Sequence, residues 1–140
     1  MTKKARDIMT PDVECVGVND TIQDAAKMLA KLNVGSMPIC GDDNRLKGML
    51  TDRDIVVKVI AEGRDVSTTT VGELAEGKPV TIGADDSIHE AIETMAEHKV
   101  RRLPVIDGHE LIGIVSQADI AKHAEDDDIG RLVEVISTGG

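Results

Sequence analysis

Residues 48–54 read GMLTDRD, and residues 113–119 read GIVSQAD. Both stretches run from a glycine through two apolar residues and a hydroxyl residue to an aspartate three positions later. The match extends outward, so that residues 20–55 and 86–120 share their apolar, proline and aspartate positions. A repeat of this length is a complete supersecondary unit. A site built by one copy is therefore expected to have a twin in the other.

The spacing of the repeat locates its turn. The offset between the copies is 66 residues as far as Pro38 and Pro104, and 65 residues after them. One residue is therefore missing from the second copy, in a polar stretch that reads as a turn. The Asp107-Gly108 step in that stretch is a strong hairpin signal.

Each copy predicts the element order β-α-β-β-α. In the first copy a short strand at 13–18 leads to an N-cap at Asp20 or Thr21, followed by apolar residues at helical spacing. A strand, a turn and a second strand follow, and each proline suits an edge or starting strand. The closing helices are expected at about 52–61 and 117–123.

The predicted fold class is α/β (α+β), with two β-α-β-β-α motifs packed sheet to sheet about a pseudo-two-fold axis. The expected boundaries are 7–66 for the first motif and 71–124 for the second, with a polar linker at 63–70. Residues 125–140 have an acidic start and then apolar residues at helical spacing, which predicts a C-terminal helix.

Composition narrows the possible functions. The chain has 140 residues, of which 41% are apolar, but it contains no Phe, Tyr or Trp. Bases cannot stack on aromatic side chains here, which argues against most single-strand nucleic-acid modules. The net charge of −10 repels nucleic acid and anionic membrane surfaces. With no long apolar run and no signal-peptide pattern, we expect a soluble, cytoplasmic protein without nucleic-acid or membrane partners.

The two cysteines flank the first predicted helix. Cys15 lies on the first strand and Cys40 at the end of the next, and a right-handed β-α-β crossover lays such strands parallel and close. One interpretation is a redox-labile disulfide; the other is two small buried apolar residues, the commoner fate of free cysteines. The second copy has Thr81 and Ile106 at these positions. No residues have metal-ligand spacing, and no metal is expected.

The hydroxyl-x-x-Asp ends of the two copies have two compatible interpretations. A carboxylate can accept hydrogen bonds from the vicinal hydroxyls of a ribose, and the helix start beside it favours a phosphate. Alternatively, Thr51 with Asp54 and Ser116 with Asp119 form capping boxes, with Asp in place of the usual Glu. The same residues can cap a helix and hold a ligand.

With these features the chain resembles a tandem pair of CBS domains, the stand-alone Bateman module. The resemblance rests on the repeat, the hydrophobic-Pro-Val/Ile step before each hairpin, the Gly-x-x-Ser/Thr-x-x-Asp ends and the opening DIMTP at residues 7–11. More narrowly, the chain is similar to small actinobacterial hypoxic-response proteins that consist of two CBS motifs.

The resemblance implies binding of an adenosyl ligand (AMP, ADP, ATP or S-adenosylmethionine) in clefts between the motifs. It assigns Thr51 and Asp54 to one cleft, and Ser116 and Asp119 to the other. It also implies lining residues, which are Val34, Gly35 and Ser36, Val100, Arg101 and Arg102, and, touching adenine, Val13 and Val80.

Arg101 and Arg102 stand out in so acidic a chain. A guanidinium can clamp a phosphate with paired donors; alternatively, both are solvated charges facing Asp42, Asp43 or Glu97. The first copy has Gly35 and Ser36 instead, so the two sites are not equivalent.

The expected function is that of a non-enzymatic regulatory module that forms a homodimer, with an adenine nucleotide as ligand and no obligatory cofactor. It would signal through its conformation to an effector protein. The alternative is a ligand-free, redox-responsive interaction or scaffold protein that uses Cys15 and Cys40.

Overall fold

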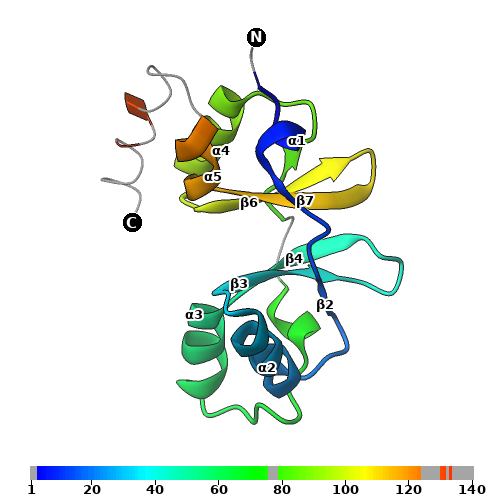
Figure 1. The fold of residues 1–140 in the computed structure, drawn as a ribbon. Helices are drawn as coiled ribbons and strands as arrows, with labels where there is room; N and C mark the ends of the chain where they lie inside the picture. Colours follow the sequence, from blue (N-terminus) through cyan, green and yellow to red (C-terminus); the bar gives the residue numbers. More distant parts are fainter. Residues whose placement is uncertain (1–2, 76–78, 124–129, 132, 134–140) are drawn as a thin grey trace. The chain divides into compact units, whose positions relative to one another are not determined.

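The computed structural model describes the whole chain except residues 1–2, 76–78, 124–129, 132 and 134–140. Helices and short strands are interspersed along the chain, which agrees with the predicted α/β (α+β) class (Figure 1). The chain forms two compact units. We call Glu14–Pro79 the first unit, and Met1–Val13 with Val80–Gly140 the second unit.

The first unit contains a three-stranded sheet in the order β2-β3-β4. Its strands and helices are β2 (Val16–Gly17), α2 (Ile22–Leu32), β3 (Ser36–Cys40), β4 (Leu46–Thr51), α3 (Asp52–Asp54), the π-helix η1 (Ile55–Ile60) and the 3-10 helix η2 (Val71–Leu74). Strand β2 runs parallel to β3, and β4 runs antiparallel to it. The predicted order β-α-β-β-α is therefore confirmed in this unit.

The second unit repeats this order and adds one strand. Its elements are α1 (Ala5–Ile8), β1 (Thr10–Pro11), β5 (Ile82–Gly83), α4 (Ile88–His98), β6 (Arg102–Asp107), β7 (Glu110–Ser116) and α5 (Gln117–His123). The sheet order is β1-β7-β6-β5, with β1 antiparallel to β7 and β5 parallel to β6.

The long helix of each unit begins at a hydroxyl cap. Thr21 accepts a hydrogen bond from the Asp24 amide, and Ser87 accepts one from the Glu90 amide, both at 3.1 Å. Both helices bury one aliphatic face, and both end at a residue in the left-handed conformation, Asn33 or Lys99. Each core consists of aliphatic side chains and methionine.

The segment that precedes each repeat packs on the unit built by the other repeat. Ala5 and Ile8 of α1 are buried in the core of the second unit, and Val71 and Leu74 of η2 are buried in the first. Lys4 bridges to Ser87, and Thr70 bridges to Thr21. The compact units therefore group residues 7–13 with the second repeat and residues 71–79 with the first.

Residues 63–70 are not a free linker. The Ile22 amide donates to the Thr69 carbonyl at 2.9 Å, and the Gln23 amide donates to the Val66 carbonyl at 3.0 Å. Thr69 is itself buried. This polar stretch forms hydrogen bonds to the start of α2. A sequence pattern cannot distinguish a polar segment that is bonded in this way from one that is exposed to solvent.

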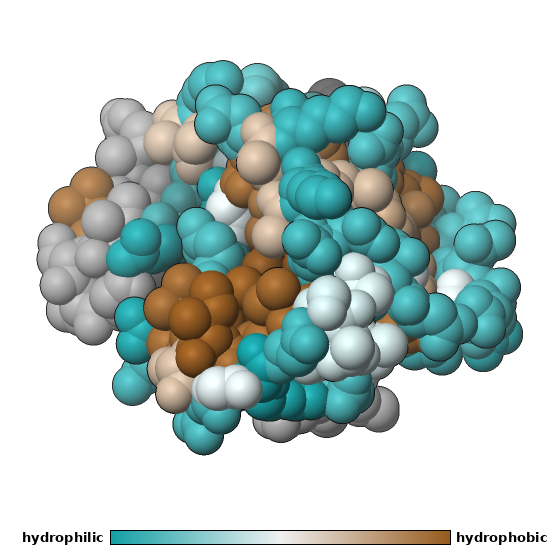
Figure 2. Space-filling view, turned by 90° about the horizontal axis from the view of Figure 1, so that it is seen from below, coloured by the Kyte–Doolittle hydropathy of each residue, from teal (hydrophilic) through white to brown (hydrophobic). Residues whose placement is uncertain are grey.

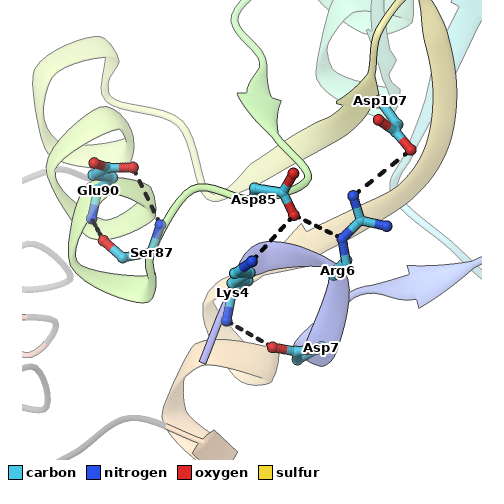
Figure 3. A network of polar contacts seen from close by, with 7 residues as sticks. All are labelled: Lys4, Arg6, Asp7, Asp85, Ser87, Glu90 and Asp107. Atoms are coloured by element: carbon cyan, nitrogen blue, oxygen red, sulfur yellow. Dashed lines mark hydrogen bonds and ion pairs between the residues drawn. The ribbon is translucent and has the colours of Figure 1, made fainter. Parts of the chain in front are cut away.

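Ion pairs connect α1 to the rest of the second unit (Figure 3). Arg6 contacts Asp85 at 3.0 Å and Asp107 at 3.7 Å, while Lys4 contacts Asp85 at 3.6 Å. The hydrogen bond from Arg6 and its positive charge hold the pKa of Asp85 below its ordinary value. The N-terminal segment is thus held in two ways. Ala5 and Ile8 are buried in the core, and the ion pairs lie at the surface.

Both prolines lie in central strands, not in edge strands. Pro38 is in β3 and Pro104 is in β6, and each of these strands has a neighbour on both sides. The parallel partner pairs only from Ile39 in β3 and from Val105 in β6. Each proline therefore lies before the part of its strand that pairs with the parallel neighbour. Its missing N–H group removes no hydrogen bond to that neighbour.

The helix expected at 52–61 is α-helical only over α3 and continues as η1. The Ala61 amide donates to the Val56 carbonyl and the Arg64 amide to the Val59 carbonyl, a spacing of five residues. The expected C-terminal helix at 125–140 falls almost wholly outside the described residues. Within the described part of the chain, no helix is long and apolar enough to span a membrane.

Candidate functional site

The hydroxyl-x-x-Asp end of the first unit lies where β4 passes into α3. Thr51 Oγ1 accepts from the Asp54 amide at 3.0 Å, and Asp54 Oδ2 accepts from the Thr51 amide at 3.1 Å. These two bonds make a capping box, so the capping interpretation of the sequence is confirmed. Both side chains keep part of their surface exposed.

The equivalent end of the second unit lies where β7 passes into α5. Ser116 Oγ accepts from the Asp119 amide at 3.1 Å and donates to Asp119 Oδ2 at 3.0 Å. Asp119 Oδ2 also accepts from the Ser116 amide at 2.9 Å. Both bonds that the Asp119 carboxylate accepts in this cap therefore end on Oδ2.

The two aspartates differ in their second oxygen. In the first unit Lys58 Nζ lies 3.5 Å from Asp54 Oδ1. The repeat places His123 where Lys58 stands, and His123 Nδ1 instead contacts Lys3 Nζ at 3.1 Å. Among the described residues, Asp119 Oδ1 has no hydrogen-bond or ion-pair partner. It is the carboxylate oxygen available to accept from a ligand hydroxyl.

Strand pairing places the segment before each proline beside the hydroxyl-x-x-Asp end of the same unit. Ser36 pairs with Thr51, and Arg102 pairs with Ser116, so each pair projects from the same face of its sheet. The backbone ties these segments to the helix starts. The Asp52 amide donates to the Gly35 carbonyl at 2.9 Å, as the Gln117 amide does to Arg101 at 3.1 Å.

Arg101 and Arg102 are both exposed. In the part of the chain that the structure describes, neither guanidinium forms an ion pair, with Glu97 or with any other carboxylate. The second unit thus combines an available carboxylate oxygen and unpaired guanidinium groups within one stretch of sheet. The first unit has Ser36 in place of Arg102, and Ser36 Oγ is buried without a hydrogen-bond partner among the described residues.

Val34 lines a different surface of the first unit. It borders a cavity of about 340 Å³, which is lined by Ala26, Leu29, Ala30, Asn33, Val34, Asp52, Ile55 and Val56. Asp52 also lines this cavity, and the sequence did not predict it as a site residue. Its position directly after Thr51 was the one feature of the sequence that could have indicated it. Apart from Val34, none of the sequence-predicted site residues lines this cavity.

The two valines expected at the adenine precede the first strands. Val13 lies three residues before β2 and is grouped with the second unit, and Val80 lies two residues before β5. Val80 packs against the core of the second unit, and Val100 does the same. The unit that contains Ser116 and Asp119 therefore also contains Val13, Val80, Val100, Arg101 and Arg102.

Cys15 and Cys40 lie at disulfide distance in the first unit, with their Cα atoms 5.8 Å apart. The β2–β3 pairing brings them together, because Gly17 pairs with Cys40. Among the described residues, no group of three or more His, Cys, Asp or Glu side chains is arranged to hold a metal ion.

The repeat, the two β-α-β-β-α units and the twin capped aspartates define a tandem pair of CBS-type motifs. The sequence pattern of the CBS domain matches residues 5–61 and 71–126. The chain belongs to the CBS domain family.

Similar proteins agree with this assignment. Hypoxic response protein 1 of Mycobacterium tuberculosis (strain CDC 1551 / Oshkosh) is 50% identical over 132 residues, which are 94% of this chain and 92% of that protein. The crystal structure of Hypoxic Response Protein I with two coordinated zinc ions matches with a TM-score of 0.83 and 51% identity, over 88% of this chain and 100% of that one. The predicted similarity to hypoxic-response CBS proteins is therefore confirmed.

Two related structures contain adenosyl ligands. CBSX2 in complex with AMP matches with a TM-score of 0.73 and 26% identity, over 85% of this chain and 93% of that one. The CBS domain pair of MJ0100, in complex with 5-methylthioadenosine and S-adenosyl-L-methionine, matches with a TM-score of 0.77 and 26% identity, over 87% and 97%.

Proposed function

We propose that this chain is a cytoplasmic, non-catalytic regulatory module that binds an adenosine-containing ligand and passes the signal to a partner through its conformation. The observation that carries the proposal is that the second unit has an available Asp119 oxygen and, opposite Ser116 in the strand register, the exposed Arg102. A carboxylate suits the ribose hydroxyls, and a guanidinium suits a phosphate. The AMP and S-adenosyl-L-methionine complexes of related CBS proteins support the same ligand class.

The two halves are proposed to differ in affinity. In the first unit Lys58 already occupies one oxygen of Asp54, and no arginine stands opposite Thr51. An anionic nucleotide is therefore expected to bind through Ser116, Asp119 and the two arginines, with Val100, Val80 and Val13 supplying aliphatic contacts. Thr51 and Asp54, with Val34, Gly35 and Ser36, form the weaker site.

Ligand binding can act as a signal only if the ligand binds one conformation better than another. Ser116 and Asp119 hold the start of α5, so a ligand that engages them is coupled to that helix. We propose no catalytic role for the two aspartates, because their hydrogen bonds to the amides and hydroxyls at the helix starts are those of a cap.

A thermal-shift screen tests this proposal. AMP, ADP, ATP and S-adenosylmethionine are each added to the wild-type chain, with GMP as the matched base control. A ligand at 100 times its Kd should stabilise the fold by about 2.7 kcal/mol and raise the Tm by several degrees. If no adenosyl ligand raises the Tm, or if GMP acts as strongly as AMP, the proposal fails.

The Cys15–Cys40 pair supports a second candidate, a redox-responsive interaction module. Closing a loop across 25 residues should stabilise the first unit by about 3 kcal/mol. Intact-mass analysis after alkylation, with and without reductant, tests this candidate. Two alkylated thiols in the untreated protein under oxidising conditions would exclude it.

A further inference from the structure

The closing helices of the two units differ at the position four residues after the capped aspartate. The first unit has Lys58 there, and the second unit has His123. Lys58 Nζ lies 3.5 Å from Asp54 Oδ1, so a positive charge is held beside that oxygen. Asp119 Oδ1 has no partner among the described residues, although residue 123 is one helical turn away and within reach of it. The first unit therefore shows where a positive charge at residue 123 would bind.

His123 contacts a residue of the N-terminal segment instead. Its Nδ1 atom lies 3.1 Å from Lys3 Nζ, just before α1. A lysine ammonium group can only donate hydrogen bonds, so Nδ1 is the acceptor and the imidazole in this contact is neutral. Protonation of the ring would place two positive charges at hydrogen-bond distance, and their repulsion would break the contact.

The charges around His123 leave one carboxylate free to receive it. Helix α1 and strand β7 pack against α5. The charged side chains of these elements and of the segment before α1 are Lys3, Lys4, Arg6, Asp7, Glu110, Asp119 and Lys122.

The other two carboxylates of this set are placed differently from Asp119. Asp7 accepts a hydrogen bond from the Lys4 amide at 2.9 Å, and Glu110 begins β7 at the end far from α5. Asp119 lies on the same helix as His123, and its Oδ1 atom has no partner among the described residues. It is therefore the carboxylate that a protonated His123 would bind.

The residues before the two cations also differ. Val56 and Val57 precede Lys58 as exposed aliphatic side chains, and Figure 2 shows hydrophobic side chains gathered on the face that it views. The equivalent residues of α5 are Ala121 and Lys122, both exposed. His123 thus follows a small and a charged residue and keeps part of its own surface exposed, so its ring can exchange protons with water.

We infer that His123 is a pH-sensitive switch for the ligand site of the second unit. In its neutral form it accepts from Lys3 and leaves Asp119 Oδ1 available. Once protonated, it leaves Lys3 and pairs with Asp119 Oδ1, as Lys58 pairs with Asp54. Histidine is suited to this role because its charge changes between about pH 5 and 8. The effect on ligand affinity rests on the proposed function, whereas the change of contact does not.

NMR spectroscopy of the ligand-free full chain tests the change of contact. At about pH 8, nuclear Overhauser contacts should join the His123 ring to the Lys3 side chain. At about pH 5, contacts between the ring and the β-protons of Asp119 should replace them. A ring that still contacts Lys3 at the lower pH, or that leaves Lys3 without approaching Asp119, overturns the inference.

AMP titrations at the same two pH values test the effect on binding. His123→Gln can still accept from Lys3 but takes up no proton, and His123→Lys carries the positive charge of the first unit. At about pH 8 the wild type should bind AMP as tightly as His123→Gln, and at about pH 5 at least about fivefold more weakly. His123→Lys should bind weakly at both. The AMP phosphate takes up a proton near about pH 6, but this affects all variants alike.

His109→Gln is the matched control. His109 is exposed in the turn between β6 and β7, so this variant should keep the pH dependence of the wild type. A wild type that follows His123→Gln at both pH values overturns the switch. If no variant binds AMP at either pH, the proposed function fails, and the NMR experiment alone decides whether His123 changes its contact.

Discussion

Asp54 and Asp119 hold the same repeat position and make the same cap, but their surroundings differ. Lys58 lies beside one oxygen of Asp54, while the matching oxygen of Asp119 has no partner among the described residues. Arg102 lies opposite Ser116, where the first unit has Ser36 opposite Thr51. The chemistry that would select an anionic ligand is therefore concentrated in the second unit.

Arg102→Ala should separate phosphate recognition from adenosine recognition. Loss of a charge-assisted hydrogen bond should weaken AMP binding about tenfold or more, and it should leave the affinity for adenosine nearly unchanged. Competition binding with both ligands measures this. Arg45→Ala, another exposed arginine, serves as the control. Equal losses for AMP and adenosine would show that Arg102 does not contact the phosphate.

Gly113 and Gly48 are equivalent in the repeat but have different neighbours. A Cβ on Gly113 would lie 2.6 Å from Met9 Sδ and 2.7 Å from the Thr10 carbonyl, whereas the nearest atom to a Cβ on Gly48 is 3.7 Å away. Gly113→Ala should therefore destabilise the fold by about 1–3 kcal/mol, and Gly48→Ala by less than about 1 kcal/mol. Urea denaturation of both variants measures the contrast, and similar losses would contradict the observed β1–β7 contact.

At the scale of elements, α1 is the least expected part of the architecture. It precedes the first repeat but buries Ala5 and Ile8 in the second unit, and η2 makes the reciprocal contact in the first. The core of each unit therefore includes a segment that directly precedes the other repeat in the sequence.

Ile8→Ala should loosen the second unit, and Leu74→Ala should loosen the first. Each removes a nearly fully buried aliphatic side chain and should cost about 2–5 kcal/mol. Hydrogen exchange should rise in residues 80–123 for Ile8→Ala, and in residues 14–75 for Leu74→Ala. The reverse pattern would mean that each leading segment packs on its own repeat.

The ion pairs of α1 should make its attachment sensitive to acid. The pKa of Asp85 is lowered by Arg6, so the ionised form stabilises the fold at neutral pH, and this contribution is lost as the pH falls through the folded-state pKa. Asp85→Asn should lower the Tm slightly at pH 7, and the difference from wild type should close below about pH 4.

Asp12→Asn is the matched control for this experiment. Asp12 is exposed, and no bond to its side chain is found among the described residues. Its Tm should follow that of the wild type at every pH. A difference between Asp85→Asn and wild type that persists unchanged to pH 3 would rule out the ionised carboxylate as its cause.

The sequence predicted the elements well where two copies carried the same signal. The hydroxyl caps and aliphatic spacing of residues 21–32 and 87–98 predicted both long helices. The central position of Pro38 and Pro104 was not predictable, because it depends on where the parallel neighbour begins to pair. The π-helical turn at Val56 and Val57 also lacked a signal, since its apolar run satisfies either helical geometry.

For the whole molecule, the sequence identified the family and the paired hydroxyl-x-x-Asp ends. It could not show that Lys58 lies beside Asp54, because that contact depends on side-chain orientation after η1 forms. Nor could it show that Arg102 lies opposite Ser116, which follows from the register of β6 and β7. The differences between the copies indicate a ligand preference only when the strand register is known, because the register places Ser36 opposite Thr51 and Arg102 opposite Ser116.

Calorimetric titration of AMP into the purified chain tests the central claim most directly, with Asp119→Asn and Asp54→Asn measured alongside. The Asn side chain keeps an acceptor for the cap but removes the carboxylate charge. We predict that AMP binds the wild type, that Asp54→Asn retains this binding, and that Asp119→Asn weakens it at least about tenfold. Absence of binding to the wild type, or unchanged binding to Asp119→Asn, would contradict the account.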